Sequence, residues 1–267
     1  MPKIKKGAVR KILFSQETPL YFERSPYAVM TEKFGLKIDF FKFFRIQGLE
    51  ADKFMQNGLN ILDYTAVIMT SKNAIDHFFR IVKALKISLP ASLHYFCVNE
   101  AMAAYLQKHM VYCKKRQIFF PPDGDLENLA NLAAANSKHK FLIPCSLDVS
   151  MHTLIDLLDE KKVDYAKAEV FKIRLRNAAK AVNIYDYDMI VFFSPYGIQS
   201  LQKYFPDYKQ DNTVIAAFGT QVAKAAEEAG LQVLVKAPTK ENPSIFTAID
   251  HYLEKRNGVR KSFLYKY

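Results

Sequence analysis

The sequence predicts an α/β protein built on parallel sheets, because short buried strands alternate with amphipathic helices along the chain. Residues 189–193 form an unbroken apolar run rich in β-branched and aromatic side chains, which is typical of a strand buried on both faces. A turn of small and polar residues follows at 194–197, and Ile198, Leu201 and Tyr204 then repeat at helical spacing. Such a strand, turn and helix build a parallel sheet, whose ligands bind at the carboxyl ends of the strands.

The same unit occurs earlier in the chain in a matching form. Residues 63–75 align with residues 186–198 without a gap, and residues 95–106 align with residues 215–226 in the same order. One match would be weak evidence, since buried strands resemble one another, but two matches in one order indicate an internal duplication. The sequence therefore predicts two related α/β domains; two unrelated Rossmann-like halves are the alternative.

The other elements follow from apolar spacing and from capping residues. Residues 11–15 are predicted to form a strand, and Ser25 and Pro26 begin a helix that Gly35 ends. Residues 36–46 are predicted to form a second strand. Further helices are predicted over residues 75–85, 101–109, 126–134, 151–161, 221–229 and 244–255, and further strands over residues 117–120, 141–143, 168–175, 214–218 and 233–235.

The distribution of strands predicts that one domain interrupts the other. A simple division near residue 130 would leave the second copy with too few strands to match the first. We therefore predict a discontinuous first domain from residues 1–44 and 172–267, and an inserted second domain from residues 45–171. Residues 168–175 alternate in character, which suits an extended connector paired with the outgoing strand. Two antiparallel crossings would join the domains and leave a cleft between them.

The formal charge of +11 at pH 7 predicts either an anionic ligand or a basic surface without one. Lysine and arginine are spread over the whole chain, with short clusters only at residues 3–6 and 114–116. A duplex-binding protein would concentrate them on one helix or arm. We therefore expect a polyanionic small molecule as the ligand and no nucleic-acid partner.

The sequence predicts a cytoplasmic protein that does not enter membranes. No apolar run approaches the roughly 20 residues that a membrane-spanning helix needs, and no apolar signal core follows the basic amino end. Cys97, Cys113 and Cys145 are odd in number and widely spaced, which fits neither a disulfide framework nor a zinc site.

Small polar turns recur at strand ends, whereas the common catalytic signatures are absent from the sequence. There is no glycine-rich nucleotide motif, no nucleophile elbow and no pair of histidines at metal-ligand spacing, so we predict no metal. Each turn offers helix N-terminal amides with hydroxyl or amide side chains, which bind carboxylates or phosphates. For any single turn, helix capping alone is the alternative. The predicted substrate-binding residues are Ser15, Gln16, Thr70, Ser71, Lys72, Asn73, Asn99, Glu100, Ser194, Tyr196, Gly197, Gly219 and Thr220.

In their order along the chain, these motifs resemble those of the uroporphyrinogen-III synthase family. The resemblance covers nearly the whole chain and rests on residues 66–74, 95–98, 192–198 and 217–219, with Ala223 beyond them. It implies two flavodoxin-like domains, each a parallel sheet with helices on both faces. The first domain would be split in sequence, and a two-stranded linker would join the two.

The resemblance also implies a reaction. The family's substrate is hydroxymethylbilane, a linear tetrapyrrole with eight carboxylates, which loses water and closes to a ring with one pyrrole inverted. Loss of the hydroxyl gives a reactive azafulvene whose unassisted closure yields the uninverted isomer, so the enzyme has to hold a folded conformer of its substrate. This implies a hydro-lyase and cyclase of haem biosynthesis that needs no cofactor, and we expect a monomer.

This chain departs from the family pattern at several positions. The family often has an arginine where this chain has Gln16, and threonines where it has Met102 and Val222. A tyrosine that is the family's candidate for assisting hydroxyl departure falls on Phe171, and Tyr196 stands in a turn that usually reads Ser-Pro-Ser-Gly. The candidate substitutes for the lost hydroxyl are Tyr165 and Tyr196.

Two other functions stay open on the sequence alone. A catalytically impaired family member would bind a tetrapyrrole or another polyanion without converting it. A nucleic-acid-associated protein would use the positive charge, and its affinity would fall steeply with ionic strength.

Overall fold

The computed structural model describes residues 7–109, 117–148 and 152–258, and it divides into two compact units. Unit 1 comprises Met1–Arg45 with Arg174–Tyr267, and unit 2 comprises Ile46–Ile173. Some predicted features lie outside the described residues: the basic clusters at 3–6 and 114–116, Cys113, and the first residue of the helix predicted over 151–161.

The described part of unit 1 contains a five-stranded parallel sheet in the order β11-β10-β9-β1-β2. Its strands are β1 (Lys11–Phe14), β2 (Lys37–Phe40), β9 (Met189–Phe192), β10 (Val214–Phe218) and β11 (Val233–Ala237). Numbered within the unit, this order is 2-1-3-4-5, the flavodoxin-like order. Every residue of β9 is buried, which its unbroken apolar run predicts.

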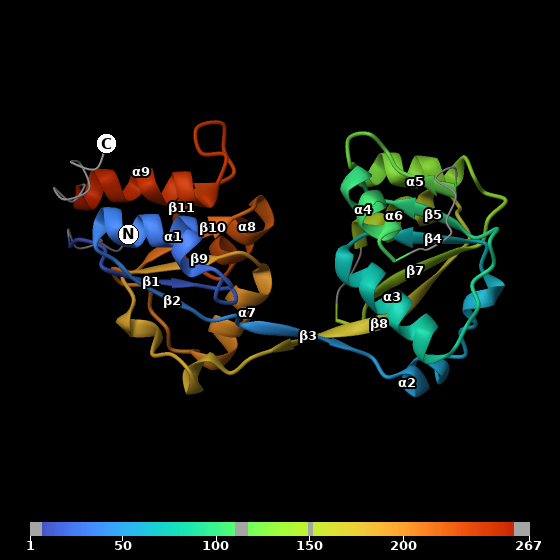
Figure 1. Cartoon of the computed structure of the whole chain (residues 1–267), viewed down its shortest axis with the longest axis horizontal. Helices are drawn as coiled ribbons and strands as arrows, with labels where there is room; N and C mark the ends of the chain where they lie inside the picture. The colour runs from blue at the N-terminus through green and yellow to red at the C-terminus, as the bar shows by residue number, and fades with distance from the viewer. Residues whose placement is uncertain (1–6, 110–116, 149–151, 259–267) are drawn as a thin grey trace. The chain divides into compact units, whose positions relative to one another are not determined.

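Helices cover both faces of this sheet (Figure 1). They are α1 (Pro26–Phe34), α7 (Pro195–Tyr204), α8 (Thr220–Glu228) and α9 (Ile245–Asn257), with short 3₁₀ turns at Phe22–Arg24, Ala178–Lys180 and Ile184–Asp186. The helices α1 and α9 pack together over one core, and α7 and α8 pack over the other. As predicted, Gly35 ends α1 in the left-handed conformation, with φ 70°. Ser25 precedes α1, but its hydroxyl donates back to the Phe22 carbonyl and does not cap the helix.

The sheet of unit 2 repeats this arrangement and adds one strand. Its order is β3-β8-β7-β4-β5-β6, and the strands from β8 to β6 are parallel. The strands are β3 (Phe44–Gly48), β4 (Ala66–Met69), β5 (His94–Cys97), β6 (Ile118–Phe119), β7 (Phe141–Ser146) and β8 (Tyr165–Leu175). By the sequence match, β4 and β5 correspond to β9 and β10. The run β8-β7-β4-β5-β6 then occupies the same places as β2-β1-β9-β10-β11, although β7 and β8 follow β4–β6 in the chain whereas β1 and β2 precede β9.

Two helix layers also cover the sheet of unit 2. The helices are α2 (Ala51–Met55), α3 (Lys72–Ala84), α4 (Glu100–Gln107), α5 (Leu126–Ala134) and α6 (His152–Glu160), with a 3₁₀ turn at Ile61–Asp63. Phe54, Phe78 and Leu106 of α2, α3 and α4 enter one core, and Leu129 and Leu158 of α5 and α6 enter the other. In the described residues, no helix is long and apolar enough to cross a membrane.

The single strand predicted over residues 36–46 is wrong, because the structure has two strands there, β2 and β3. The Phe41 amide still bonds the Phe14 carbonyl of β1, at 3.0 Å, but the Phe43 carbonyl accepts from the Arg176 amide, at 2.7 Å. The chain therefore leaves one sheet at residues 41–43 and joins the other. At the far end of β3, the Leu49 amide donates to the Val170 carbonyl at 3.0 Å, so β3 and β8 run antiparallel.

Strand β7 is longer than predicted and passes through Pro144. The neighbouring strand β4 pairs only with Phe141 and Leu142, so no partner on that side needs an N–H from residue 144. On its other side, β7 pairs with β8 as far as Ser146. The chain therefore turns only beyond Ser146.

Candidate functional site

In unit 1, three of the predicted turns lie side by side at the carboxyl ends of β1, β9 and β10, which are neighbours in the sheet. The Ser15 amide donates to the Val191 carbonyl at 2.9 Å, and its buried hydroxyl accepts from the Phe193 amide at 3.1 Å. These two bonds tie the turn after β1 to the turn after β9. Gln16 points elsewhere: its side-chain amide donates to the Tyr27 hydroxyl on α1.

The helices that follow these strands begin in different ways. Ser194 caps α7 by accepting from the Tyr196 amide at 3.3 Å, and its carbonyl accepts from the Gly197 amide at 3.0 Å. At α8 the preceding residue is Gly219, with φ 101°, a conformation that favours glycine, and it offers no capping side chain. The amides of Thr220 and Gln221 have no partner among the described residues. The start of α8 is therefore an open donor site in unit 1.

In unit 2, the turns after β4 and β5 lie next to each other, tied by a bond of 3.1 Å from the Val98 amide to the Met69 carbonyl. Ser71 caps α3 by accepting from Ala74 N at 3.1 Å, and Asn99 caps α4 by accepting from Met102 N at 2.9 Å. Thr70 precedes the α3 cap. Within the described chain, the amides of the next two residues in each helix (Lys72 and Asn73, Glu100 and Ala101) have no partner. Each turn thus presents a pair of free donors at the positive end of a helix.

Lys72 is exposed, and its ammonium lies 5.3 Å from the centre of the Tyr105 ring. The hydroxyl of Tyr105 donates to Asp76 Oδ1 at 2.8 Å, and His109 Nε2 lies 2.9 Å from the same oxygen. The bond to Asp76 raises the pKa of Tyr105. Because Asp76 already interacts with Tyr105 and His109, the ammonium of Lys72 can bind an anionic ligand at the start of α3. Glu100 is also exposed and adds negative charge at the start of α4.

Phe171 is a residue of β8 that pairs with Ser146, the last residue of β7, and it is buried, with 6% of its surface exposed. Its ring stacks on His77 of α3, with centroids 5.3 Å apart and planes 28° from parallel. His77 Nδ1 accepts from Arg80 Nε at 3.2 Å, so the proton of the neutral ring is on Nε2. Burial, and then the charge of Arg80, lowers the pKa of His77. Sequence reasoning missed His77, because it lies one helical turn beyond Asn73 and not in the turn itself.

The two tyrosines proposed as substitutes differ in position: Tyr165 lies at the amino edge of one sheet, and Tyr196 lies at the carboxyl edge of the other. Tyr165 pairs with Phe141 at the amino end of β7, and its hydroxyl donates to Asp159 at 2.8 Å. Burial, and then Asp159, raises the pKa of Tyr165 to about 12. Tyr196 lies in the first turn of α7 at the carboxyl edge, and its ring centroid is 5.3 Å from that of Phe44. Of the two, Tyr196 is therefore the one beside the predicted turns.

The comparisons with known proteins agree with this architecture. A family model described as uroporphyrinogen-III synthase HemD matches residues 25–247. The chain belongs to the uroporphyrinogen-III synthase family. Among curated protein sequences, no significant match was found.

Two solved uroporphyrinogen-III synthases share the fold of this family member. A mutant of the enzyme from the extremely thermophilic bacterium Thermus thermophilus matches with a TM-score of 0.60 at 12% identity, over 92% of this chain and 99% of that one. The enzyme from Helicobacter pylori matches with a TM-score of 0.59 at 17% identity, over 92% of this chain and 100% of that one. At these identities the likeness concerns the fold alone.

Large apolar side chains are exposed beside the polar turns of this uroporphyrinogen-III synthase family member. Leu20 is 94% exposed and Tyr21 is 74% exposed in the loop after β1, and Phe218 is exposed at the end of β10. In unit 2, Phe120 follows β6 and Leu147 follows β7, and both are exposed. Sequence reasoning missed these residues, although an apolar residue within a polar strand-end turn is a readable signal.

Cysteine is not a suitable nucleophile in the described part of this family member. Cys97 and Cys145 are both buried. Burial, and then the charge of Glu169, raises the pKa of the Cys145 thiol to about 11. A thiol with a raised pKa stays protonated at neutral pH and is inert.

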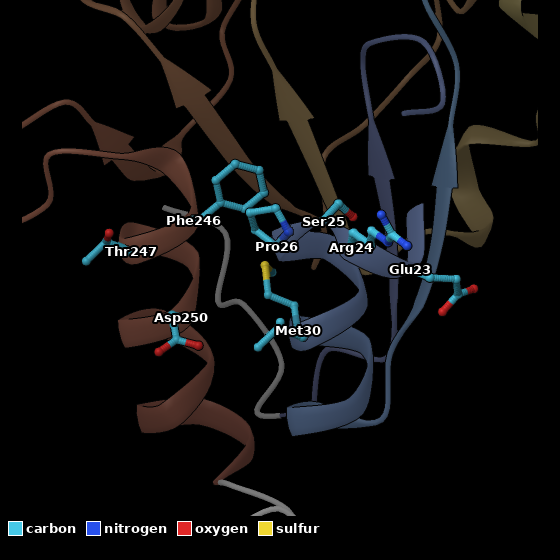
Figure 2. Close-up of a pocket in the computed structure, with 9 residues that line it drawn as sticks. Glu23, Arg24, Ser25, Pro26, Met30, Phe246, Thr247 and Asp250 are labelled. Atoms are coloured by element: carbon cyan, nitrogen blue, oxygen red, sulfur yellow. The ribbon is translucent and has the colours of Figure 1, made fainter. Parts of the chain in front are cut away.

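A groove of about 590 Å³ lies between α1 and α9 of unit 1 (Figure 2). Pro26, Met30 and Phe246 form its apolar wall, and Glu23, Arg24 and Asp250 are its charged lining residues. None of the predicted substrate-binding residues lines this groove. We therefore place the candidate site of this synthase family member at the strand ends.

Proposed function

We propose that this chain is a working uroporphyrinogen-III synthase, which closes hydroxymethylbilane to a ring with one pyrrole inverted and with loss of water. The observation that carries the proposal is the pairing of two kinds of surface at the carboxyl edges of the sheets. Free amide pairs at the starts of α3, α4 and α8 suit carboxylates. Exposed Leu20, Tyr21, Phe120, Leu147 and Phe218 suit the apolar faces of pyrrole rings.

The proposed catalytic contribution is mainly to hold the substrate in one conformation. The electron pair of the pyrrole nitrogen expels the hydroxyl, which leaves as water after taking up a proton, and loss of the N–H proton gives the azafulvene, whose closure needs no further activation. Which isomer forms then depends on which pyrrole carbon lies near the azafulvene carbon. Several weak carboxylate contacts, spread over separate helix starts, would fix that geometry and favour the inverted closure.

Departure of the hydroxyl as water requires a proton, and we propose that the hydroxyl of Tyr196 donates to the departing oxygen. Phe171 has no hydroxyl, and Tyr165 pairs with Phe141 at the amino end of β7, away from the predicted turns. Tyr196 lies in the first turn of α7, beside Ser194 and Phe44. A neutral donor in this position would stabilise the departing oxygen by about 1–3 kcal/mol.

The experiment that tests the proposal uses freshly prepared hydroxymethylbilane. The protein is incubated with it, the products are oxidised, and the two uroporphyrin isomers are separated and quantified. We expect the inverted isomer in excess over the spontaneous background. If only the uninverted isomer forms although the protein binds the substrate, the chain is instead a binding protein for tetrapyrroles or other polyanions.

We also propose that residues 1–44 with 172–267 and residues 45–171 are two separately folded domains. The compact units, Met1–Arg45 with Arg174–Tyr267 and Ile46–Ile173, support this division. Limited proteolysis is expected to release one compact internal fragment from the region 45–171. Two stable halves produced by a single cut near residue 130 would contradict it.

A further inference from the structure

The ladder formed by β3 and β8 brings two arginines directly opposite each other. The bonds that join Phe43 to Arg176 and Leu49 to Val170 fix the antiparallel register at both ends of the ladder. Counting inward from either end pairs Arg45 with Arg174. Side chains directly opposite each other in such a ladder share one face, so the two guanidinium groups lie on the same side.

That side of the ladder is the exposed one. The neighbouring pair, Ile46 and Ile173, alternates to the other side and packs against the core of unit 2. Arg45 and Arg174 are both exposed. Lys172 lies two residues before Arg174 on β8, so the alternation of the strand places it on the same face. The ladder therefore has one apolar face, and its other face is cationic at residues 45, 172 and 174, whereas Phe43 at its end is buried in a core of unit 1.

No described carboxylate pairs with these cations. Of the acids beside this segment, Asp148 accepts from the Ile173 amide at 2.7 Å, and Glu17 lies 4.0 Å from Arg176. Like charges directly opposite each other destabilise an antiparallel pair. The arrangement thus carries a cost in the free protein that an anion would remove.

We propose that Arg45 and Arg174 form a binding site for carboxylate groups of the substrate on the exposed face of this ladder. The identity of that ligand rests on the proposed function. Guanidinium groups bind carboxylates through two parallel hydrogen bonds, and two of them side by side suit the paired acidic side chains of one pyrrole ring. Lys172 adds a third positive charge nearby without a fixed geometry.

The proposal predicts effects of opposite sign in the free and bound protein. Arg174→Gln removes the repulsion, so the free variant should unfold about 1–2 °C above the wild type. The same change removes one carboxylate contact, so the Kd for an octacarboxylate should rise about three- to fivefold. A merely structural arginine would lower the unfolding temperature and leave the Kd unchanged.

The test measures thermal unfolding and equilibrium binding of uroporphyrin III, the stable oxidised form of the proposed product, by its fluorescence. Arg45→Gln and Arg174→Gln are compared with Lys167→Gln, which removes an exposed cation of β8 that pairs with Ile143 of β7 and not with β3. The arginine variants should show both effects, and the lysine variant should show neither. An unchanged Kd in both arginine variants, or no uroporphyrin binding by the wild type, overturns the proposal.

Failure of this site and failure of the proposed reaction give different results. Binding is measured without turnover. A wild type that binds uroporphyrin through the two arginines but makes no inverted isomer would therefore support the arginine site and refute the proposed reaction. A wild type that makes the inverted isomer, together with arginine variants whose KM and Kd are unchanged, would support the proposed reaction and refute the arginine site.

Discussion

Gly197, in the first turn of α7, has no room for a side chain. A β-carbon at this position would lie 2.7 Å from Cδ1 and 3.3 Å from Cε1 of Phe192. Carbon atoms in ordinary contact stay about 3.5–4.0 Å apart. Gly197→Ala must therefore move the start of α7 or displace the ring of Phe192, which is fully buried and packs against Phe43 at 5.8 Å between centroids.

Overpacking of this kind costs about 1–3 kcal/mol. For a chain of this size, such a cost lowers the unfolding temperature by about 2–10 °C. The displaced turn also carries Ser194 and Tyr196, so we expect the KM for hydroxymethylbilane to rise together with the loss of stability. Thermal unfolding and steady-state kinetics measure the two effects.

Gly7→Ala is the matched control for this substitution. A β-carbon at Gly7 would meet no atom within 4 Å, and the backbone there is not in the left-handed region. Its unfolding temperature and KM should stay those of the wild type. The reasoning is refuted if Gly197→Ala also keeps both values of the wild type.

Three further predictions concern the other parts of the site and of unit 2. If Tyr196 already donates to the departing oxygen, Phe171→Tyr should leave kcat nearly unchanged; a rise in kcat by a factor of about 5 to 150, worth about 1–3 kcal/mol, would instead give that role to a hydroxyl at residue 171. Lys72→Ala should raise KM several-fold with kcat nearly unchanged. Lys108→Ala, whose ammonium lies over the same tyrosine ring, should leave both constants unchanged, and equal effects of the two would contradict a specific contact. Burial, and then His94, lowers the pKa of His139, so the unfolded state takes up the proton first. Stability should therefore be full above about pH 6.5 and fall below it, and urea unfolding of His139→Gln should show a shallower fall.

The strands and turns that carry strong local signals were predictable from the sequence. The buried run at β9, the Ser194 cap and the glycine that ends α1 depend on neighbouring residues alone, so local spacing identifies them. The side-by-side arrangement of the turns follows as well, because parallel strands end at one edge of a sheet.

Features that depend on distant pairing were not predictable. The phenylalanines at 40, 41, 43 and 44 give no local sign of where β2 ends and β3 begins, because a bond between Phe43 and Arg176 decides it. The opposition of Arg45 and Arg174 depends on the same register. The burial of Phe171 against His77 likewise depends on how α3 packs on β8, which residue spacing does not encode.

Hydrogen exchange with and without uroporphyrin III tests most directly whether carboxylates bind at the carboxyl edges of the sheets. The free amides at Lys72, Asn73, Thr220 and Gln221 should exchange more slowly when the ligand is bound, whereas residues 138–140 at the amino edge should exchange at an unchanged rate. Protection confined to the amino edge or to the groove between α1 and α9, with the four amides unaffected, would contradict this location.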